Sequence, residues 1–567
     1  MGVINLKEAN CRNCYKCIRH CPVKAIQMTR GQARIVEELC IGCGNCLKVC
    51  PQNAKQVESP VESIQTWMDE GEVVLSLAPS FPAAFDVDNP LRVVSALKAL
   101  GFAAVAETAE GAEAVSKAYR EDYDGSRRHV LTTSCPTVNR LVEKYYPHLT
   151  DCLSPVVTPM IAHGRMLKER YPGAKVVFAG PCVAKKLELT DPQAKGAVDG
   201  VLSFDELSEW FEAEGICVTD YPVKPFDSES CNVARLYPLT GGVEKSALGG
   251  YEGKRRVIKV DGLVRCRELL DHLEELSDPC WIEMNACVEG CINGPGNTKS
   301  PLPQYERGKR VRDYIAGSER QDASSDIKVS LACEYPADAK VLLKTVPEAD
   351  IEAVLHQTGK FTPEDELNCG TCGYDSCREK AAAVCLGMAE SDMCLPFMRN
   401  RNEAISNLII AYTPNAIAVL DKDYTILDFN VAAEQLFHIA KNEAVGQNFV
   451  TLFDYNPFKK LENVPENTYS GRGYYIKGGI HFMEILTYVP LQKMYIGIFV
   501  DISREIKKEQ AYQKMQEETL DMAQKVIDKQ MRVAHEIAEL LGETTAETKV
   551  TLTRLQKVVG TREEDDG

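Results

Sequence analysis

The sequence predicts a multidomain protein that combines α/β and α+β folds. Two cysteine-rich stretches flank a long middle segment, apolar strand-like runs alternate with helical patterns through that segment, and the C-terminal end is helical and highly charged. A chain of 567 residues has the length of about three to five domains. We place the domains at residues 1–57, 58–345, 346–398, 399–505 and 506–567.

The composition argues against several classes of function. A net charge of −17 lacks the basic surface that nucleic acid phosphates require, and it disfavours an anionic membrane surface. No basic segment followed by an apolar run opens the sequence, and no apolar stretch reaches the roughly 18 residues of a membrane helix. We therefore expect a cytoplasmic protein without membrane insertion. Its 23 cysteines indicate metal binding, because a reducing compartment keeps thiols out of disulfides.

The first cysteine-rich stretch, residues 1–57, contains the spacing C-x2-C-x2-C-x3-C-P twice, beginning at Cys11 and at Cys40. Two residues between thiolates let a loop wrap one corner of a cubane, and the fourth cysteine of each run ligates the other cluster. The pattern resembles the bacterial two-cluster ferredoxins and implies two 4Fe–4S clusters. The alternative, zinc knuckles, pairs C-x2-C units at longer separations. The expected ligands are Cys11, Cys14, Cys17 and Cys50 for one cluster and Cys40, Cys43, Cys46 and Cys21 for the other.

The middle segment, residues 58–345, predicts an α/β domain with mainly parallel sheets. Four of its apolar strand-like runs are Val73–Ala78, Val130–Thr133, Ala174–Phe178 and Val257–Val260, and helical patterns separate them. Ligands of open parallel sheets lie beyond the carboxyl ends of the strands. Cysteines follow three strand-like runs, so we expect four thiolates to surround one buried 4Fe–4S site: Cys135, Cys182, Cys287 and Cys291.

The segments around these cysteines, Leu131–Pro136, Ala179–Glu188 and Glu283–Asn297, resemble the three H-cluster signatures of the iron–iron hydrogenases. The resemblance implies a cubane held by the four thiolates and bridged to a two-iron subsite with CO, cyanide and a dithiolate amine. By motif position Cys291 is the bridging ligand. Lys185 matches the lysine that donates to a cyanide, as a buried anion requires a cationic partner, and Glu188 matches a structural carboxylate.

The departures from the family pattern predict slow turnover. Ser134 stands where the family has a proton-relaying cysteine, and an aliphatic hydroxyl is far less acidic than a thiol of pKa near 8.5. General acid–base steps contribute about 10²–10⁴-fold, so the loss is of that order. Asn285 and Gly180 occupy Met positions of the family, Pro295 interrupts the third signature, and Val138 replaces a Trp. No carboxylate could be matched to the family's proton path. The catalytic candidates are Ser134, Lys185, Glu188 and Asn285.

The second cysteine-rich stretch, residues 346–398, has the spacing C-x2-C-x4-C-x16-C, with Pro396 just beyond. It resembles the small Fe–S domain found beside Rnf-type and corrinoid redox proteins, which implies one more 4Fe–4S cluster. A structural zinc with four thiolates is the alternative. The remaining cysteines are expected to pack in apolar cores. The expected ligands are Cys369, Cys372, Cys377 and Cys394, and the packing cysteines are Cys152, Cys217, Cys231, Cys266, Cys280, Cys333 and Cys385.

Residues 399–505 resemble a PAS domain. Strands are expected at Ala416–Leu420 and Thr425–Phe429, and Asn430 is placed to cap a helix that runs through Phe437. His438 and His481 are candidate haem ligands, but a lone histidine is more often structural, and the fold alone does not name a ligand. The PAS ligand is therefore unknown. Later strands are expected near Gly473–Ile476, His481–Tyr488 and Met494–Asp501.

Residues 506–567 predict a helical dimerisation or output segment. Apolar residues from Met515 to Leu540 recur at roughly heptad spacing, which is typical of a coiled coil. Gly542 is expected to end this helix, and a second helix follows over 545–559. We expect the pair to form a helical hairpin that dimerises into a four-helix bundle, so the protein is a homodimer through PAS and coiled coil. The acidic tail Thr561–Gly567 is expected to be disordered.

Together these resemblances imply a sensory hydrogenase. It would bind dihydrogen, split or form it slowly as a weak dihydrogen:acceptor oxidoreductase, and exchange electrons with a redox partner such as ferredoxin. It would relay its redox state through the Fe–S clusters and the PAS domain to a signalling protein, a phosphatase or a kinase. Two alternatives remain: a catalytic hydrogenase coupled to ferredoxin or NADH, and a redox regulator that holds cubanes only. Lys185 and Cys291 argue against cubanes only, because both serve the two-iron unit.

Overall fold

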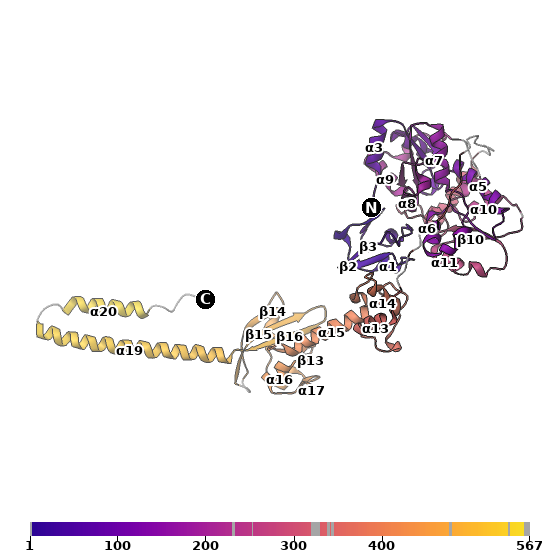
Figure 1. Ribbon diagram of the computed structural model, residues 1–567. Coiled ribbons are helices and arrows are strands. Elements are labelled where there is room, and N and C mark those ends of the chain that lie inside the picture. The colour runs from indigo at the N-terminus through magenta and orange to yellow at the C-terminus, as the bar shows by residue number, and fades with distance from the viewer. Residues whose placement is uncertain are drawn as a thin grey trace. The chain divides into compact units, whose positions relative to one another are not determined.

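The computed structural model describes residues 3–228, 233–251, 253–318, 329–336, 341, 345–475, 479–541 and 545–560. The chain forms two compact units, Met1–Met398 and Arg399–Gly567 (Figure 1). The first unit contains the two cysteine-rich stretches and the segment between them, and the second contains the predicted PAS domain and the C-terminal helices.

The N-terminal part of the first unit has the duplicated architecture that the repeated spacing predicts. Strand β1 (Ile4–Leu6) pairs antiparallel with β4 (Lys55–Val57), and β2 (Ile26–Thr29) pairs antiparallel with β3 (Gln32–Ile35). Two short helices, α1 (Lys16–Arg19) and α2 (Asn45–Lys48), carry the third cysteine of each run. The ferredoxin-like N-terminus is thus confirmed as a fold.

The middle part contains two parallel sheets. The first has the strand order β6-β5-β8-β9, and the second has the order β10-β11-β7. Every residue of β5, β7 and β11 is buried, as in parallel strands that are covered on both faces. All four predicted strand-like runs form parallel strands, which confirms the α/β expectation. The strands are β5 (Val73–Leu77), β6 (Ala104–Glu107), β7 (His129–Leu131), β8 (Lys175–Gly180), β9 (Gly200–Ser203), β10 (Arg256–Asp261) and β11 (Cys280–Asn285).

Helices connect and cover these strands (Figure 1). Helix α6 begins at Pro136, where proline is suited to the first helical position because its missing N–H would have no partner there. The bounds are α3 (Val61–Glu70), α4 (Arg92–Ala99), α5 (Ala109–Tyr123), α6 (Pro136–Tyr145), α7 (Pro159–Arg170), α8 (Ala184–Glu188), α9 (Phe204–Ala213), α10 (Gly242–Leu248), α11 (Leu263–Asp271) and α12 (Gln304–Ala316).

The second cysteine-rich part packs on the ferredoxin-like part. It contains α13 (Glu348–Gln357), α14 (Cys377–Cys385) and the start of α15 (Leu395–Tyr412). The Met28 N–H donates to the Met388 carbonyl at 2.9 Å, and the Lys24 ammonium donates to the Gly373 carbonyl at 2.6 Å. Ile18, Met28, Tyr374 and Met393 belong to one shared apolar core. The two cysteine-rich parts therefore form one body.

The second unit contains a five-stranded antiparallel sheet of order β13-β12-β16-β15-β14, and the PAS expectation is confirmed as a fold. Asn430 accepts from the Ala433 N–H at 3.0 Å and caps α16 as expected. A core of phenylalanines lies against the sheet. β14 begins before the predicted strand, and residues 476–478 lie outside the described residues. The elements are β12 (Ala416–Leu420), β13 (Ile426–Phe429), α16 (Val431–Phe437), α17 (Lys441–Ala444), α18 (Phe449–Phe453), β14 (Thr468–Tyr475), β15 (Ile480–Val489) and β16 (Met494–Asp501).

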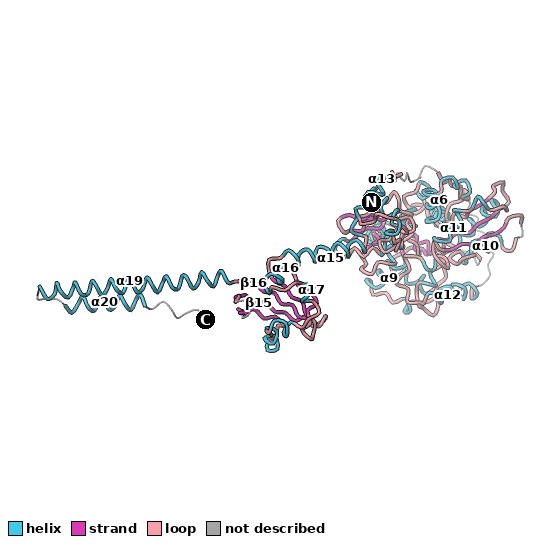
Figure 2. The backbone as a smooth tube through the Cα atoms, turned by 90° about the horizontal axis from the view of Figure 1, so that it is seen from below, coloured by secondary structure: helices cyan, strands magenta, loops and turns pink. Residues whose placement is uncertain are grey.

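Two helices end the second unit: α19 (Ser503–Leu541) and α20 (Thr545–Gly560). Both views show α20 beside α19, and the Gln556 amide donates to Gln524 at 3.1 Å (Figures 1 and 2). Met515 and Met522 of the expected seam are 58% and 63% exposed in the single chain. The coiled-coil homodimer therefore stays a prediction. Gly542, the Leu540 and Val558 side chains and the tail 561–567 lie outside the described residues. None of the described helices combines the length and apolar content of a bilayer span.

A buried ion pair joins α5 to α7 in the first unit. The Arg170 guanidinium donates to both carboxylate oxygens of Glu110, and His163 Nε2 lies 3.3 Å from Glu110 Oε2. Burial raises the pKa of Glu110, but His163 and Arg170 outweigh it and lower the pKa to about 2. The carboxylate therefore stabilises the folded chain in its ionised form.

Glu110→Gln is expected to lower the free energy of unfolding by about 3 kcal/mol at pH 7, since a pKa of about 2 replaces an ordinary 4.5 on folding. The folded pKa is the lower one, so the stabilisation is complete above pH 4.5 and is lost as the pH falls toward 2. Thermal unfolding of the full chain at a series of pH values measures this. Glu121→Gln, on the exposed side of α5, is the control. An equal stability loss at pH 3 and pH 7 would contradict the ionised pair.

Candidate functional site

Two adjoining cavities lie beyond the carboxyl ends of strands from both parallel sheets. Cys135 follows β7, Cys182 follows β8, and Cys287 and Cys291 follow β11. All four line the first cavity. The structure thus brings together the four predicted ligands, although β8 belongs to a different sheet from β7 and β11. Five residues line both cavities: Ser134, Cys182, Lys185, Asn285 and Cys291.

The third segment reaches Cys182 closely because of its glycines. A Cβ on Gly294 would lie 2.2 Å from the Pro181 carbonyl oxygen, and the Gly296 N–H donates to that oxygen at 2.8 Å. A side chain at Gly294 would push this segment away from Pro181. Glycine at this position therefore holds Cys291 next to Cys182 in the wall between the two cavities.

The cavity suits four cysteines bound to a metal cluster better than four free thiols. Burial raises the pKa of Cys182 to about 11 and that of Cys287 to about 12, and it also raises the pKa of Cys291 well above its ordinary value. A metal deprotonates a coordinating thiol, so four thiolates in one buried cavity require metal as their counter-charge. Among the described residues no three His, Cys, Asp or Glu side chains are arranged to hold a single metal ion. Four cysteines around one cavity suit a metal cluster.

Lys185 and Glu188 form a buried ion pair on α8. The Lys185 ammonium donates to Glu188 Oε2 at 2.8 Å, and Glu188 Oε1 accepts from the Thr158 hydroxyl at 2.7 Å. Lys185 lines both cavities, whereas Glu188 lines neither. An ammonium has three N–H groups, so Lys185 can also donate into the cavity to an anionic ligand. Glu188 orients Lys185 and does not itself face the site.

Ser134 hydrogen-bonds into the protein interior. Its hydroxyl lies 3.1 Å from the Tyr119 hydroxyl, which in turn lies 3.1 Å from the Thr133 hydroxyl. Thr133 donates to the Val156 carbonyl at 2.6 Å. Burial raises the pKa of Tyr119 to about 12. This series of groups ends in a backbone carbonyl that cannot pass a proton on, and it begins with two weak acids.

A second series of hydrogen bonds leads from the second cavity toward the surface. Thr108 lines this cavity, and its hydroxyl lies 2.7 Å from the Ser76 hydroxyl. Ser76 Oγ lies 2.7 Å from His163 Nδ1, and His163 Nε2 reaches Glu110, which pairs with Arg170. The Arg170 side chain is 23% exposed. Sequence analysis missed this series, because its groups come from β5, the start of α5 and α7; the only sequence signal is that Thr108 follows the end of β6.

Asn285 is held in place by a buried carboxylate. The Asn285 amide donates to Glu283 Oε1 at 3.2 Å, and Glu283 also accepts from the Gly241 and Glu244 N–H groups at 2.8 and 2.9 Å. Burial raises the pKa of Glu283 to about 7. Glu283 thus orients the amide of Asn285 in the wall between the cavities.

The ferredoxin-like part contacts the first cavity directly. Gly42 and Cys43 line the cavity, and Gly44 lies against Pro295. Gly44 has φ +70, and a Cβ there would lie 2.5 Å from the Pro295 ring. Pro295, which interrupts the third signature, is therefore the surface on which the loop of one N-terminal cluster packs.

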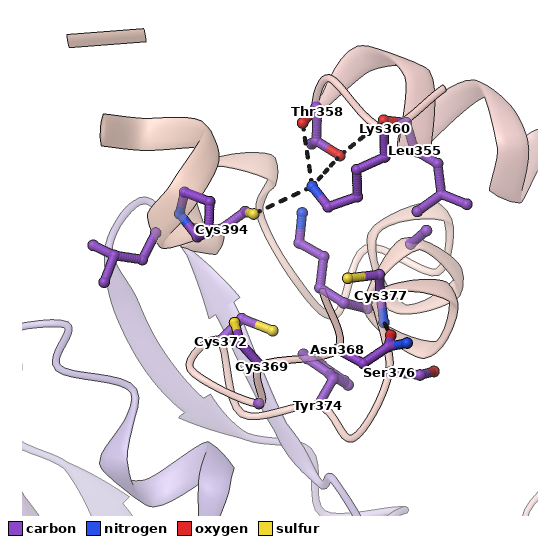
Figure 3. Close-up of a pocket in the computed structure, with 15 residues that line it drawn as sticks. Leu355, Thr358, Lys360, Asn368, Cys369, Cys372, Tyr374, Ser376, Cys377 and Cys394 are labelled. Atoms are coloured by element: carbon purple, nitrogen blue, oxygen red, sulfur yellow. Dashed lines mark hydrogen bonds between the residues drawn. The ribbon is translucent and has the colours of Figure 1, made fainter. Parts of the chain in front are cut away.

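The small Fe–S part has its own cavity, and Figure 3 shows its four cysteines turned toward it. The cavity is lined by Cys369, Cys372, Cys377 and Cys394, the predicted ligands. Tyr374 lies within electrostatic reach of Cys372 and of Cys21, a predicted ligand of the ferredoxin-like part. The structure therefore places this cavity next to the N-terminal clusters.

The cysteines outside the clusters follow the packing expectation only in part. Cys266, Cys280 and Cys333 are buried, as predicted. The prediction was wrong for Cys217 and Cys385, which are exposed. Cys217 lies in a loop beyond the end of α9, and Cys385 ends α14 on its outer side, so neither position faces a core. Cys152 is half-buried, and Cys231 lies outside the described residues.

The two histidines of the PAS domain do not share a site. His438 is exposed at the end of α16, and His481 on β15 stacks on Tyr474 with ring centroids 4.6 Å apart. This arrangement favours the structural interpretation over a haem site.

Family models cover four parts of the chain. Residues 71–295 match the iron only hydrogenase large subunit, C-terminal domain, and residues 3–67 match a 4Fe–4S dicluster domain. Residues 365–396 match an Fe–S cluster family, and residues 403–478 match the PAS fold.

Several relatives are hydrogenases. The periplasmic Fe hydrogenase large subunit of Nitratidesulfovibrio vulgaris is 27% identical over 367 residues, which cover 53% of this chain and 87% of that protein. The NADP-reducing hydrogenase subunit HndD of Solidesulfovibrio fructosivorans is 25% identical over 358 residues, covering 52% of this chain and 57% of that protein. Iron hydrogenase 1 of Clostridium pasteurianum is 28% identical over 208 residues, which cover 32% of this chain and 36% of that protein.

A solved structure of FeFe-hydrogenase HydA1 from Chlamydomonas reinhardtii is similar over 50% of this chain and 93% of its own, with 17% identity and a TM-score of 0.36. The PAS domain of an HTR-like protein from Haloarcula marismortui covers 18% of this chain and 95% of its own, with 16% identity and a TM-score of 0.16. The family matches identify the chain as a divergent FeFe-hydrogenase-like protein that also carries ferredoxin-type, small Fe–S and PAS domains.

Proposed function

We propose that this protein is a sensory hydrogenase, which binds dihydrogen at an H-cluster and relays its redox state to a signalling partner. The observation that carries the proposal is the pair of adjoining cavities that share Cys182 and Cys291. The first cavity has four thiolate ligands for a cubane, and the second has the Lys185 ammonium for an anionic two-iron subsite. When bound, that cofactor would supply the splitting and formation of dihydrogen.

Contacts between cluster loops support electron transfer to the small Fe–S domain. Cys43 of one N-terminal cluster lines the first cavity, and Cys11, Cys17, Cys46 and Cys372 lie beside one shared core. We infer a series of three further 4Fe–4S clusters from the H-cluster through the ferredoxin-like part to the small Fe–S part, with the ligands predicted from the sequence. Ferredoxin is the redox partner that this series suits.

Signal output would pass through the second unit. Helix α15 begins one residue after Cys394 and continues into the PAS domain, where the Asn430 amide donates to the Ile410 carbonyl at 2.9 Å. Beyond the PAS domain α19 and α20 have exposed apolar side chains that suit a homodimer or a phosphatase or kinase partner. We place the protein in the cytoplasm, because so many thiolate ligands need a reducing compartment.

Slow turnover follows from the two series of hydrogen bonds. The series from Ser134 ends at a carbonyl, whereas the series from Thr108 through His163 ends at Glu110 and Arg170. Thr108, Ser76 and His163 can each donate toward Glu110, but Arg170 keeps this carboxylate ionised and a guanidinium cannot take up a proton, so the series would pass protons to the surface only poorly. Aliphatic hydroxyls are weak acids, so this route is slow, which suits a sensor better than a catalytic hydrogenase.

Infrared spectroscopy of the artificially matured full chain under dihydrogen tests the proposal. We expect CO and cyanide bands that change on reduction. Cys291→Ala is expected to remove the bands, whereas Cys266→Ala, a buried cysteine that does not line either cavity, should keep them. A matured wild-type protein without these bands would favour a regulator that holds cubanes only.

Ser134→Cys is expected to raise the rate of dihydrogen oxidation on the order of 10²-fold, because a thiol replaces a much weaker acid beside the cofactor. Dye reduction by the matured protein measures the rate. Ser80→Cys is the control, since Ser80 lines the same cavity away from Tyr119. No gain in a protein with full CO bands would count against the relay argument, and a fast wild-type rate would favour a catalytic hydrogenase.

His163→Phe is expected to slow exchange between dihydrogen and D2O on the order of 10²-fold, because it interrupts the route from Thr108 to Glu110. His129→Phe is the matched control: His129 is also buried, but it lies outside the route. Unchanged CO band positions establish that the cofactor is intact. A normal exchange rate under that condition rules the route out.

A further inference from the structure

We propose that Lys360 and Lys380 raise the reduction potential of the small Fe–S cluster above those of the N-terminal clusters, so that electrons in the chain collect at the start of α15. The inference rests on the small 4Fe–4S cluster proposed above and not on hydrogen chemistry. Figure 3 shows Lys360 reaching toward Cys394 across the cavity that the four cysteines line.

Both lysines are buried beside the cluster ligands. Lys360 is 8% exposed, and its ammonium donates to Cys394 Sγ at 3.4 Å and to the Thr358 carbonyl and hydroxyl at 3.2 and 3.3 Å. Lys380 is 5% exposed and donates to the Ser391 carbonyl at 3.2 Å. Both side chains line the cavity together with the four cysteines.

Among the described residues, no carboxylate forms an ion pair with Lys360 or Lys380. Asp365 is within electrostatic reach of Lys360, but its carboxylate accepts the N–H groups of Phe361 and Thr362. Glu366 pairs with Arg378, on the outer side of α14. A buried ammonium needs a negative partner, and the cluster with its four thiolates provides one.

Buried positive charge favours the reduced state of a cluster. Reduction adds an electron to a site that is already anionic, and a nearby cation stabilises the added charge most strongly where water is excluded. Hydrogen bonds to the cluster sulfurs act in the same direction, and both factors set the potentials of Fe–S clusters. Lys360 provides both the positive charge and the hydrogen bond, because its ammonium N–H donates to the Cys394 sulfur.

The N-terminal clusters have a different environment. The sulfurs of Cys21, Cys40 and Cys50 accept from the backbone N–H groups of Ala25, Gly42 and Ala54. Lys55 is buried and lies within electrostatic reach of Cys17 and Cys46, but its ammonium donates to the Ala33 carbonyl. Lys144 lies within electrostatic reach of Cys40, but its ammonium donates to the Cys40 carbonyl and not to the sulfur. Within the described residues, the contact between an ammonium and a predicted ligand sulfur therefore occurs at Cys394.

The small cluster lies at the start of α15, so a change in its charge would be felt by this helix. Cys394 directly precedes α15, and the Met398 N–H already donates to the Cys394 carbonyl at 2.9 Å. A stored electron would thus change the charge next to the first turn of the helix that leads into the PAS domain. Because of the two lysines, the charge of the small cluster would report whether the whole series is reduced.

An EPR-monitored redox titration of the reconstituted full chain tests this. The small-cluster signal is the one altered in Cys369→Ser. In the wild type we expect this signal at the highest potential of the cubanes. Lys360→Met should lower the equilibrium constant for its reduction about tenfold, or about 59 mV for a one-electron couple. Lys360→Arg keeps the charge and should shift it much less.

Arg378→Gln is the matched control, because it removes a positive charge from α14 that faces Glu366 and not the cavity. In this variant the equilibrium constant for reduction of the small cluster should stay within twofold of the wild-type value. Lys380→Met decides the question if Lys360→Met fails to retain iron: it leaves the sulfur contact in place and should still lower the potential. A filled cluster whose potential is unchanged in the variant that retains iron overturns the inference. A wild-type chain without any small-cluster signal would refute the cluster itself.

Discussion

Four cysteines that share one cavity are the constraint on which the first unit depends. They come from the ends of three strands in two sheets, and the Lys185 ammonium lines the same cavity. Burial raises the pKa values of Cys182 and Cys287, so the arrangement makes chemical sense with a metal cluster as counter-charge. The close approach at Gly294 and the packing of Gly44 on Pro295 both serve this convergence.

The same residues explain how the cluster site is connected to its surroundings. The loop of one N-terminal cluster forms part of the wall of the first cavity, and the small Fe–S part shares an apolar core with the ferredoxin-like part. With the proposed clusters in place, electrons would have a continuous series of metal sites within one compact unit. Protons have a less efficient route, since Ser134 leads to a carbonyl and the route from Thr108 begins with two aliphatic hydroxyls. Fast electron exchange with slow proton exchange is the behaviour expected of a sensor.

Charge is distributed unevenly along this series. Lys185 and the pair Lys360 and Lys380 lie at its two ends, next to the H-cluster site and the small cluster. In both places a buried ammonium lies beside thiolates instead of being paired only with a carboxylate. The protein thus uses buried cations at the point where dihydrogen would bind and at the point where the signal would leave the first unit.

The sequence by itself determined the domain types and predicted the ligand sets, because cysteine spacing is local and encodes the shape of the loop around a cubane. It also determined the parallel strands, since predominantly apolar runs such as Val73–Leu77 indicate burial on both faces. Tertiary structure decided the rest. The sequence did not predict that β8 lies in a different sheet from β7 and β11. Nor did it predict the route from Thr108 to Arg170 or the contact of Lys360 with Cys394, because these residues lie far apart in the chain. Exposure of Cys217 and Cys385 was likewise not predictable, because a single cysteine carries no periodic signal of which side faces a core.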